Sequence, residues 1–225
     1  TNETCFTITG SNMILDGNGH TLIGDGGASD YGITTYTDSN FVNITIRNFA
    51  NIGNFTRGIY LDQVNNSLIS NNTMISQASQ TTYAVYLEDG ANNTVYSNNI
   101  NWNATTAIKT SYGVYLLANV GKTAGNNNIT GNNLTIYSQS STGQGVYFYN
   151  YGTSNSNIIQ SNTVNVNAPT SSGVYLRTDL GGTTSITSNT IQSNTINVNA
   201  TFGYGVYLSS PYGTSITSNT VQSNT

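Results

Sequence analysis

Apolar and polar residues alternate along this chain in short runs, and one four-residue phrase returns throughout. The phrase reads Gly or Ala, then Ile or Val, then Tyr, then Leu or Phe, and its copies occupy residues 58–61, 84–87, 113–116, 145–148, 173–176 and 205–208. A degenerate copy at residues 32–35 precedes them, and successive copies start 26 to 32 residues apart. A phrase repeated at this spacing indicates a repeat architecture.

Other positions of the repeat also form columns. One column is apolar and consists of Ile69, Val95, Ile129, Ile159, Ile191 and Val221. Three residues later each repeat carries an asparagine, and this column consists of Asn72, Asn98, Asn132, Asn162, Asn194 and Asn224. Further apolar residues follow two and, in most repeats, four positions after each asparagine, which is the period-2 alternation of a strand. No stretch shows helical spacing.

These patterns predict an all-β solenoid in which three short strands per coil stack in register. We expect a single parallel β-helix of about seven coils of 26–32 residues, in which residues 1–31 form N-terminal entry strands and a first coil. Residues 32–225 are then repeats of the same single domain, with an incomplete last coil. The asparagine column is expected inside, because a buried amide can hydrogen-bond the equivalent amide one coil away.

The repeat resembles a known family. Its Gly-Ile/Val-x-Leu, Asn-x-Ile/Val and Asn-Thr-Ile/Val elements are similar to the right-handed parallel β-helix repeat of the pectate-lyase-like superfamily, and residues 14–22 resemble the first-coil phrase of β-helix surface proteins, often archaeal or bacterial. The resemblance implies a right-handed helix. It does not specify an activity, because that superfamily includes lyases, hydrolases, epimerases, adhesins and inert scaffolds.

Composition narrows the possible partners. The net charge is −4 and only 6% of the residues are charged, with five Lys and Arg in total, too few to neutralise a run of phosphates. We therefore expect no nucleic-acid partner. No apolar run reaches the length of a membrane span, and no cofactor or metal is expected. Cys5, the single cysteine, is expected to be a buried thiol, with an intermolecular disulfide as the alternative.

The tyrosines of the repeated phrase are the first candidate site. Because Val and Leu flank each of them, they should point outward and be exposed. The column consists of Tyr60, Tyr86, Tyr115, Tyr147, Tyr175 and Tyr207. It could stabilise the sheet by cross-strand stacking, form a contact strip for another protein molecule, or stack against sugars.

Asp62 and Glu88 are the second candidate, because both follow the phrase leucine in adjacent coils, and Asp89 adds a third acid. Their spacing suits the carboxylate pair of a retaining glycosidase or a Ca²⁺ site, whereas the alternative is a solvated acidic face. His20, the single histidine, is assigned a structural role. The five cations are dispersed over separate coils, which disfavours a lyase or hydrolase: Arg47, Arg57, Lys109, Lys122 and Arg177.

Among about ten Asn-x-Ser/Thr matches, three lie in or just before a loop from which a glycan could project, and these are Asn54, Asn103 and Asn199. The chain reads as a processed or truncated piece, so that further coils or another subunit should cover its last strand.

The sequence therefore favours a non-enzymatic, extracellular or cell-surface structural protein that self-associates head-to-tail or laterally. The alternative is a carbohydrate-binding or polysaccharide-processing module, and if the protein is an enzyme it should be a polysaccharide lyase or glycoside hydrolase. Ice binding is a weaker hypothesis, because the threonines form no regular column.

Overall fold

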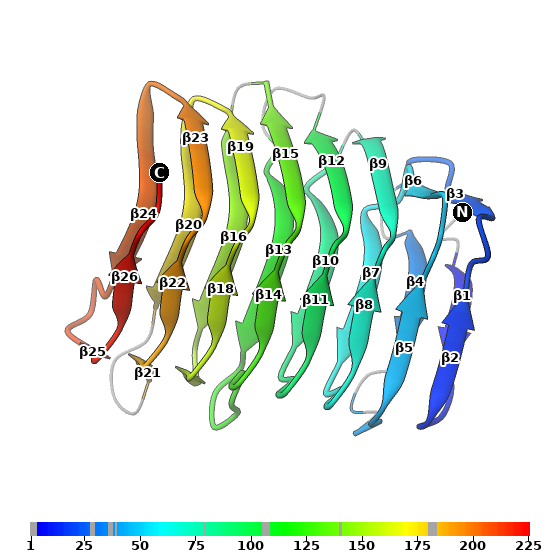
Figure 1. The fold of residues 1–225 in the computed structure, drawn as a ribbon, viewed down its shortest axis with the longest axis horizontal. Coiled ribbons are helices and arrows are strands. Elements are labelled where there is room, and N and C mark those ends of the chain that lie inside the picture. Colours follow the sequence, from blue (N-terminus) through cyan, green and yellow to red (C-terminus); the bar gives the residue numbers. More distant parts are fainter. Residues whose placement is uncertain are drawn as a thin grey trace.

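The backbone forms stacked coils of short strands, with the two chain ends at opposite ends of the stack (Figure 1). The computed structural model describes residues 4–27, 30–35, 38, 40–78, 80–104, 109–139, 141–179 and 184–225. Every strand pair in this part of the chain is parallel, and each strand pairs with its equivalent in the next coil. The fold is therefore the expected all-β parallel solenoid of about seven turns.

Two sheets run the length of the stack, and a third spans its middle and later coils. The anchor sheet, which contains the repeated phrase, has the order β1 (Thr4–Ile8), β4 (Tyr31–Thr35), β7 (Arg57–Asp62), β10 (Thr82–Glu88), β13 (Ser111–Ala118), β16 (Thr142–Asn150), β20 (Thr170–Thr178) and β24 (Phe202–Ser209). The second sheet has the order β2 (Met13–Asp16), β5 (Ile44–Arg47), β8 (Leu68–Ser70), β11 (Thr94–Tyr96), β14 (Asn128–Thr130), β18 (Ile158–Gln160), β22 (Thr190–Gln192) and β26 (Thr220–Gln222).

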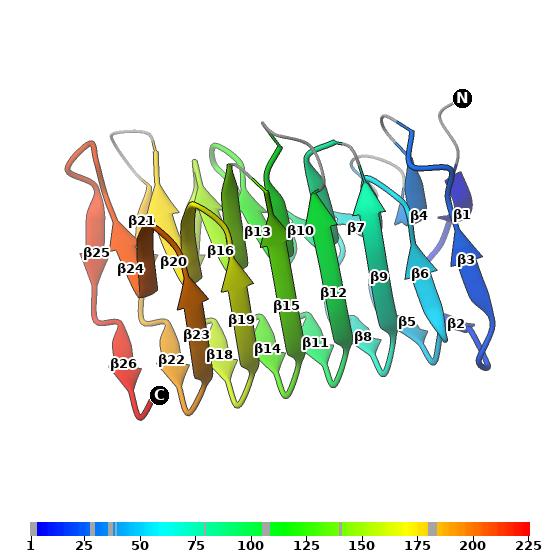
Figure 2. The same cartoon turned by 90° about the horizontal axis from the view of Figure 1, so that it is seen from above.

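The third sheet lies in front of the others in Figure 2 and has the order β9 (Thr73–Ala78), β12 (Asn99–Ala104), β15 (Asn133–Ser138), β19 (Thr163–Asn167) and β23 (Thr195–Asn199). Two strands of the first coils, β3 (Thr21–Ile23) and β6 (Asn51–Gly53), pair beside it. The last coils add a short fourth sheet of β17 (Thr153–Asn155), β21 (Ser185–Thr187) and β25 (Ser215–Thr217).

The predicted columns appear in the strand register. Val85 pairs with Val114 and Tyr86 with Tyr115 in the anchor sheet. In the second sheet the apolar column lies in register from Ile69 to Val221, and in the third sheet Trp102 lies between Ser76 and Ile136. A one-residue slip would turn each side chain to the opposite face, so this agreement fixes which residues enter the core.

The core is a continuous apolar column inside the stack. Ile, Val and Leu from the three sheets fill it, and Trp102 is the largest fully buried side chain. The glycine of the repeated phrase is needed where coils approach closely. A Cβ on Gly113 would lie 2.5 Å from the carbonyl oxygen of Gly145, and a Cβ on Gly145 would lie equally close to Gly173.

Left-handed turns bound the strands of the second sheet. The early coils use asparagine at these positions, for example Asn71 with φ of 54°, whereas the late coils use serine, for example Ser161 with φ of 53°. Asparagine tolerates this conformation better than most residues, because its side chain can hydrogen-bond locally. These turns let three flat strands close into one coil.

The end strands differ from the inner ones in exposure. Cys5 lies on the terminal strand β1 and is exposed, so the expected burial of its thiol is wrong. Phe202 and Tyr204 on β24 are 69% and 49% exposed. The described residues contain no helix with the length and apolarity needed to cross a membrane.

Candidate functional site

The six tyrosines of the repeated phrase form a continuous stack along the outer face of the anchor sheet. Their strands place them in direct register, so that each ring contacts the ring of the next coil. The centroids of Tyr60 and Tyr86 are 4.9 Å apart, and those of Tyr86 and Tyr115 are 4.7 Å apart. The contacts continue through Tyr147, Tyr175 and Tyr207 at 5.4, 4.9 and 4.8 Å. We call this column the tyrosine ladder.

The predicted side of the sheet is right for the ladder, but the predicted exposure is wrong. The ladder lies outside the main core, yet Tyr60, Tyr86, Tyr115 and Tyr147 are at most 9% exposed. A second outer column covers them, because the ring of Tyr83 stacks on that of Tyr112 at 4.8 Å and both rings contact Tyr115. Parity identifies the face of a strand but not what covers that face. Tyr175 and Tyr207 are half-buried.

Burial changes the chemistry of the ladder. Desolvation raises the pKa of Tyr115 above its ordinary value, and neighbouring tyrosines act in the same direction. The guanidinium of Arg57 lies over four rings at 4.9 to 5.7 Å from their centroids, and these belong to Tyr31, Tyr60, Tyr83 and Tyr86. This arrangement is a multiple cation–π contact at one end of the ladder.

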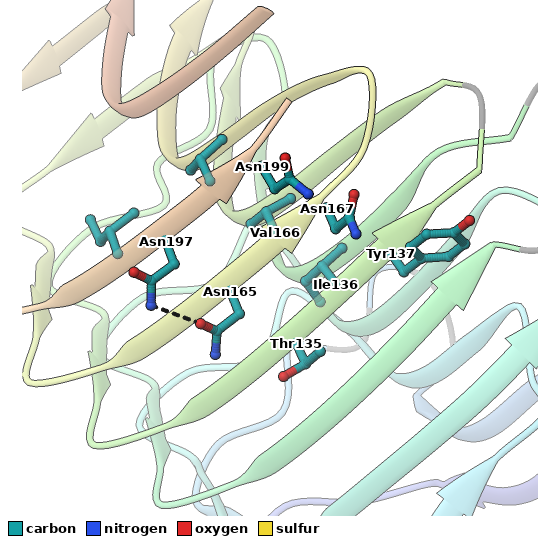
Figure 3. Close-up of a pocket in the computed structure, with 10 residues that line it drawn as sticks. Thr135, Ile136, Tyr137, Asn165, Val166, Asn167, Asn197 and Asn199 are labelled. Carbon is teal, nitrogen blue, oxygen red and sulfur yellow. Dashed lines mark hydrogen bonds between the residues drawn. The ribbon is translucent and has the colours of Figure 1, made fainter. Parts of the chain in front are cut away.

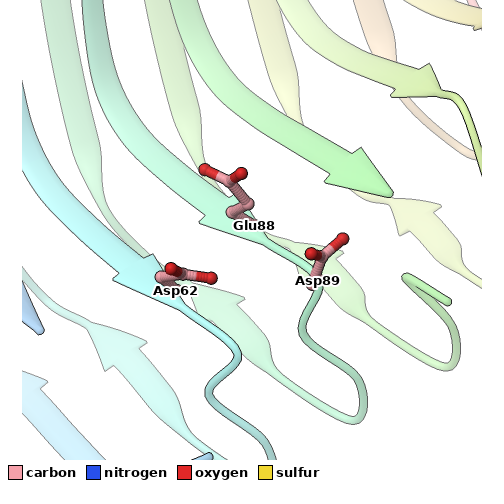
Figure 4. Close-up of side chains that lie close together, drawn as sticks. All are labelled: Asp62, Glu88 and Asp89. Carbon is pink, nitrogen blue, oxygen red and sulfur yellow. The ribbon is translucent and has the colours of Figure 1, made fainter. Parts of the chain in front are cut away.

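A cluster of three carboxylates lies beside that end, where β7 and β10 finish (Figure 4). Asp62 and Glu88 pair in register, Asp89 follows on the turn, and one carboxylate oxygen of each lies within 4.8 Å of the others. The hydroxyl of Tyr60 donates to Oε2 of Glu88 at 2.7 Å. The acidic cluster and the tyrosine ladder are therefore in direct contact.

The cluster is more enclosed than a solvated acidic face. Asp62 is only 6% exposed, and the backbone N–H of Asp38, which lies between β4 and β5, donates to its Oδ2 at 3.1 Å. Burial raises the pKa of Asp62 to about 6, and repulsion by Glu88 and Asp89 acts in the same direction against the hydrogen bond from Asp38. The expectation of a solvated face is therefore wrong for Asp62.

Asn119 binds the other two acids through three hydrogen bonds. Nδ2 of Asn119 donates to Glu88 at 2.7 Å and to Asp89 at 3.0 Å, and its backbone N–H donates to Asp89 at 2.7 Å. Nζ of Lys122 reaches Oε1 of Gln63 at 3.4 Å. Three oxygen ligands at this separation could hold a hard cation such as Ca²⁺, and two could act as an acid and a base.

The asparagine column is a hydrogen-bonded ladder inside the turn between the second and third sheets. Nδ2 of Asn132 donates to Oδ1 of Asn162 at 3.0 Å, and Nδ2 of Asn162 donates to Oδ1 of Asn194 at 3.0 Å. The backbone N–H of each residue donates to the same oxygen, and Nδ2 of Asn162 also donates to the carbonyl of Ile129 in the preceding coil at 2.8 Å. Every rung thus links two neighbouring coils.

A second ladder of the same kind lies at the turn before the second sheet, and the sequence reading missed it. Its rungs stand five residues before those of the first ladder, and they are Asn93, Asn127, Asn157, Asn189 and Asn219. Nδ2 of Asn157 donates to Oδ1 of Asn189 at 2.9 Å and to the carbonyl of Ala124 at 3.0 Å. The constant five-residue offset was the signal that could have revealed this ladder.

The opposite part of the anchor sheet holds a second group that the sequence reading did not assemble. The hydroxyl of Tyr149 donates to Oδ2 of Asp179 and lies 2.6 Å from the hydroxyl of Tyr151. Asp179 also pairs with Arg177 at 2.5 Å. Burial tends to raise the pKa of Asp179, but the bonds from Tyr149 and Arg177 outweigh it, and the pKa lies below its ordinary value.

The predicted glycan positions differ in access. Asn199 is exposed, whereas Asn54 and Asn103 are half-buried. Thr105, which completes the sequon of Asn103, lies outside the described residues. His20 is exposed at a turn of the first coil. The structure brings none of these four side chains into the acidic cluster within its described part.

The outer face of the third sheet carries a shallow recess of about 500 Å³ across β15, β19 and β23 (Figure 3). Outward amides and one phenol line it, and Nδ2 of Asn197 donates to Oδ1 of Asn165 at 2.9 Å. Tyr137 forms its edge and is 39% exposed. No charged side chain lies among the recess residues, so any ligand here would meet a neutral polar surface.

Comparison with known proteins agrees with this architecture. A family model described as right handed beta helix region matches residues 31–225. A solved structure of a mutant tailspike protein of E. coli bacteriophage HK620, in complex with a hexasaccharide, is 13% identical with a TM-score of 0.37, and the match covers 91% of this chain. The chain spans 45% of that tailspike chain, and a likeness at this level carries no argument about function. No curated protein matches the sequence.

Proposed function

Because the chain belongs to the right-handed β-helix family, we propose that it is a non-enzymatic structural protein of a cell-surface layer or an extracellular filament. One observation carries the proposal. From Asn72 onward, the two asparagine ladders bond successive coils through side-chain amides, as in the buried pair Asn132 and Asn162 at 3.0 Å. Such bonds stiffen the stack along its axis, which is the direction in which a rod carries load.

The proposal includes self-association through the outermost described coils. The last coil presents Val206 and Leu208, which are half-buried, in the columns that other coils use for core packing. Phe6 and Ile8 of β1 belong to the same outer strand position at the other end. A second copy whose first coil stacks on this last coil would continue the apolar columns head-to-tail, and such a contact propagates as a filament.

Sedimentation velocity over a range of protein concentrations tests this proposal. We expect species that grow with concentration for the wild-type chain and rods of constant size for Val206→Lys, because a lysine on an end strand blocks strand addition. Ser215→Lys is the matched control, since Ser215 lies in the same last coil and is exposed on β25. Constant size for the wild type at every concentration would contradict head-to-tail assembly.

The carboxylate pair favours a second candidate function, a carbohydrate-binding or polysaccharide-processing module. Asp62 and Glu88 lie within 4.8 Å, close to the separation of about 5 to 5.5 Å in retaining glycosidases. Asp62, with its raised pKa, would be the acid and Glu88 the nucleophile. Release of reducing ends from a panel of polysaccharides, lost in both Asp62→Asn and Glu88→Gln, would support this candidate over the structural one.

An extracellular location fits the sequons. We propose Asn199 as the first position to carry a glycan, because it is exposed, followed by the half-buried Asn54 and Asn103. Peptide mass spectrometry of material purified from the native source tests this order. Modification of Asn103 or Asn54 with Asn199 unmodified would contradict it.

A further inference from the structure

Eleven tyrosine rings of the anchor sheet and the ring of Tyr151, which directly follows β16, form one connected network that follows the axis of the stack. The network consists of the six rings of the tyrosine ladder together with Tyr31, Tyr83, Tyr112, Tyr149, Tyr151 and Tyr204. Neighbouring centroids within it lie 4.4 to 5.7 Å apart. Electrons move readily between aromatic rings in such contact, so the network is a continuous path along the rod.

One section of the network offers a single route between rings, and another section offers two parallel routes. Toward the C-terminal end, Tyr175 alone joins Tyr207 to Tyr147, at 4.8 and 4.9 Å. From Tyr147 two routes lead toward Tyr86. One runs through Tyr115, and the other runs through Tyr112 and Tyr83, with centroids 5.6, 4.8 and 5.1 Å apart.

A phenol that loses an electron must also release its hydroxyl proton, so a ring can hold the oxidised state only beside a base. Glu88 accepts a hydrogen bond from Tyr60 at 2.7 Å and has a weaker one with Tyr86, and Asp179 accepts one from Tyr149. Within the described residues the hydroxyl of Tyr115 has no carboxylate partner, and its pKa is raised by burial. A ring without such a partner, as at Tyr115, can therefore pass an electron but cannot hold the oxidised state.

The two carboxylates differ as proton acceptors. Asp179 pairs with Arg177 at 2.5 Å, so that a proton on Asp179 would break an ion pair. Glu88 lies within 4.8 Å of Asp62 and Asp89, so that a proton on Glu88 would remove repulsion between like charges. This difference favours Tyr60 over Tyr149 as the site where the oxidised state comes to rest.

We propose that the tyrosine network conducts oxidising equivalents along the rod and traps them at the Tyr60–Glu88 pair. An external one-electron oxidant takes an electron from a ring near the C-terminal end and is itself reduced. Electrons then move ring by ring toward that end. At Tyr60 the O–H bond breaks, an O–H bond forms on Glu88, and a neutral phenoxyl radical remains. This activity is independent of the proposed structural role.

A tethered photo-oxidant tests the path. A ruthenium tris(bipyridyl) label is attached to Ser209→Cys in a Cys5→Ser background, because Ser209 follows Tyr207 by two residues on the same face of β24. Flash excitation with a soluble electron acceptor generates ruthenium(III), and a nitroso spin trap marks the radical for peptide mass spectrometry. We expect the trapped adduct at Tyr60, which lies at the other end of the tyrosine ladder from Tyr207.

Phenylalanine variants keep the packing but are much harder to oxidise, so they cut the path without removing a ring. Tyr175→Phe should abolish the adduct at Tyr60, because Tyr175 is the single connection between Tyr207 and Tyr147. Tyr115→Phe should retain the adduct through the route over Tyr112 and Tyr83. The double variant Tyr112→Phe/Tyr115→Phe should abolish it. Glu88→Gln should also abolish it, because the proton acceptor is gone. Tyr137→Phe, on the third sheet and outside the network, is the control.

Two results would overturn the proposal. One is an adduct at Tyr60 that persists unchanged in Tyr175→Phe, since the oxidised state would then reach Tyr60 by another route. The other is a wild-type adduct confined to tyrosines beside the label, such as Tyr207 and Tyr204, with Tyr60 unmarked. Circular dichroism and melting temperatures equal to those of the wild type establish that each variant retains the fold.

Discussion

The asparagine ladders and the tyrosine ladder repeat one residue type in register, but they satisfy its polar group in different ways. Inside the turns, the amide of Asn162 donates to three oxygens and accepts from Asn132, and it is 1% exposed. On the outer face, rings pack on rings, and hydroxyls such as those of Tyr60 and Tyr149 donate to carboxylates at separate places along the sheet. In the asparagine ladders each amide therefore depends on its neighbours, whereas the tyrosine ladder should tolerate loss of its hydroxyls.

The largest expected effect on stability is in the asparagine ladder that contains Asn162. Asn162→Leu should lower the free energy of unfolding by about 3 kcal/mol, because buried N–H and C=O groups of neighbouring coils lose their partner. Chemical denaturation measures this loss. Asn197→Leu is the control, since Asn197 belongs to an exposed amide pair on the third sheet and should change stability by about 0.5 kcal/mol or less. Equal stability of Asn162→Leu and wild type would mean that the ladder is not internal in solution.

In the tyrosine ladder, loss of an aromatic ring should lower the free energy of unfolding, whereas loss of a hydroxyl alone should not. Tyr115→Leu should cost about 2 kcal/mol, because four ring contacts disappear from a packed face. Tyr115→Phe keeps those contacts and should stay within about 0.5 kcal/mol of the wild type. Thermal melts of the two variants separate the contributions. A Phe variant as unstable as the Leu variant would show that the outer hydroxyls carry stability too.

Asp62 and Glu88 place like charges in adjacent coils, and their repulsion should make the stability of the fold depend on pH. Because the folded-state pKa of Asp62 is about 6, above its unfolded value, the folded chain binds more protons and stability should rise as pH falls from 7 toward 4. The gain should be on the order of 1 to 2 kcal/mol and absent in Asp62→Asn. Asp16→Asn is the control, because hydrogen bonds lower the pKa of Asp16 instead. A gain of equal size in Asp62→Asn would assign it to other groups.

The smallest effect concerns the turn just before the inner ladder. Ser161 adopts a left-handed conformation that Asn71 adopts in an earlier coil. Ser161→Asn should stabilise the fold by about 0.5 kcal/mol, because asparagine tolerates this conformation better. Thr163→Asn, on the adjacent strand, should give no gain. Denaturant midpoints of the two variants decide the point, and destabilisation by Ser161→Asn would show that the serine hydroxyl has a specific role there.

The sequence revealed the fold because the repeat acts at the level of single residues. Columns such as that from Ile69 to Val221 identify strand, face and register together, and the structure follows them. The asparagine ladder from Asn72 to Asn224 could be expected on the same grounds. The second ladder, from Asn93 to Asn219, has an equally regular spacing, but the equivalent position of the preceding coil holds Ser67, so this column starts later along the chain.

The candidate site was less predictable, because it depends on loops of unequal length. Parity places Tyr86 on the outer face, but the covering ring of Tyr83 comes from the less regular start of the strand. Asp62 looks solvated from its position in the repeat, which does not reveal the hydrogen bond from the backbone N–H of Asp38. Asn119, which binds Glu88 and Asp89, stands in an irregular turn that no column includes. Such contacts follow from the path of the loops rather than from the repeat.

Negative-stain electron microscopy of native material tests the central claim most directly. A structural protein that stacks head-to-tail or side-by-side should form long fibres of uniform width. Isolated short rods at high protein concentration would contradict a filament role and would turn attention to the carboxylate pair of Asp62 and Glu88.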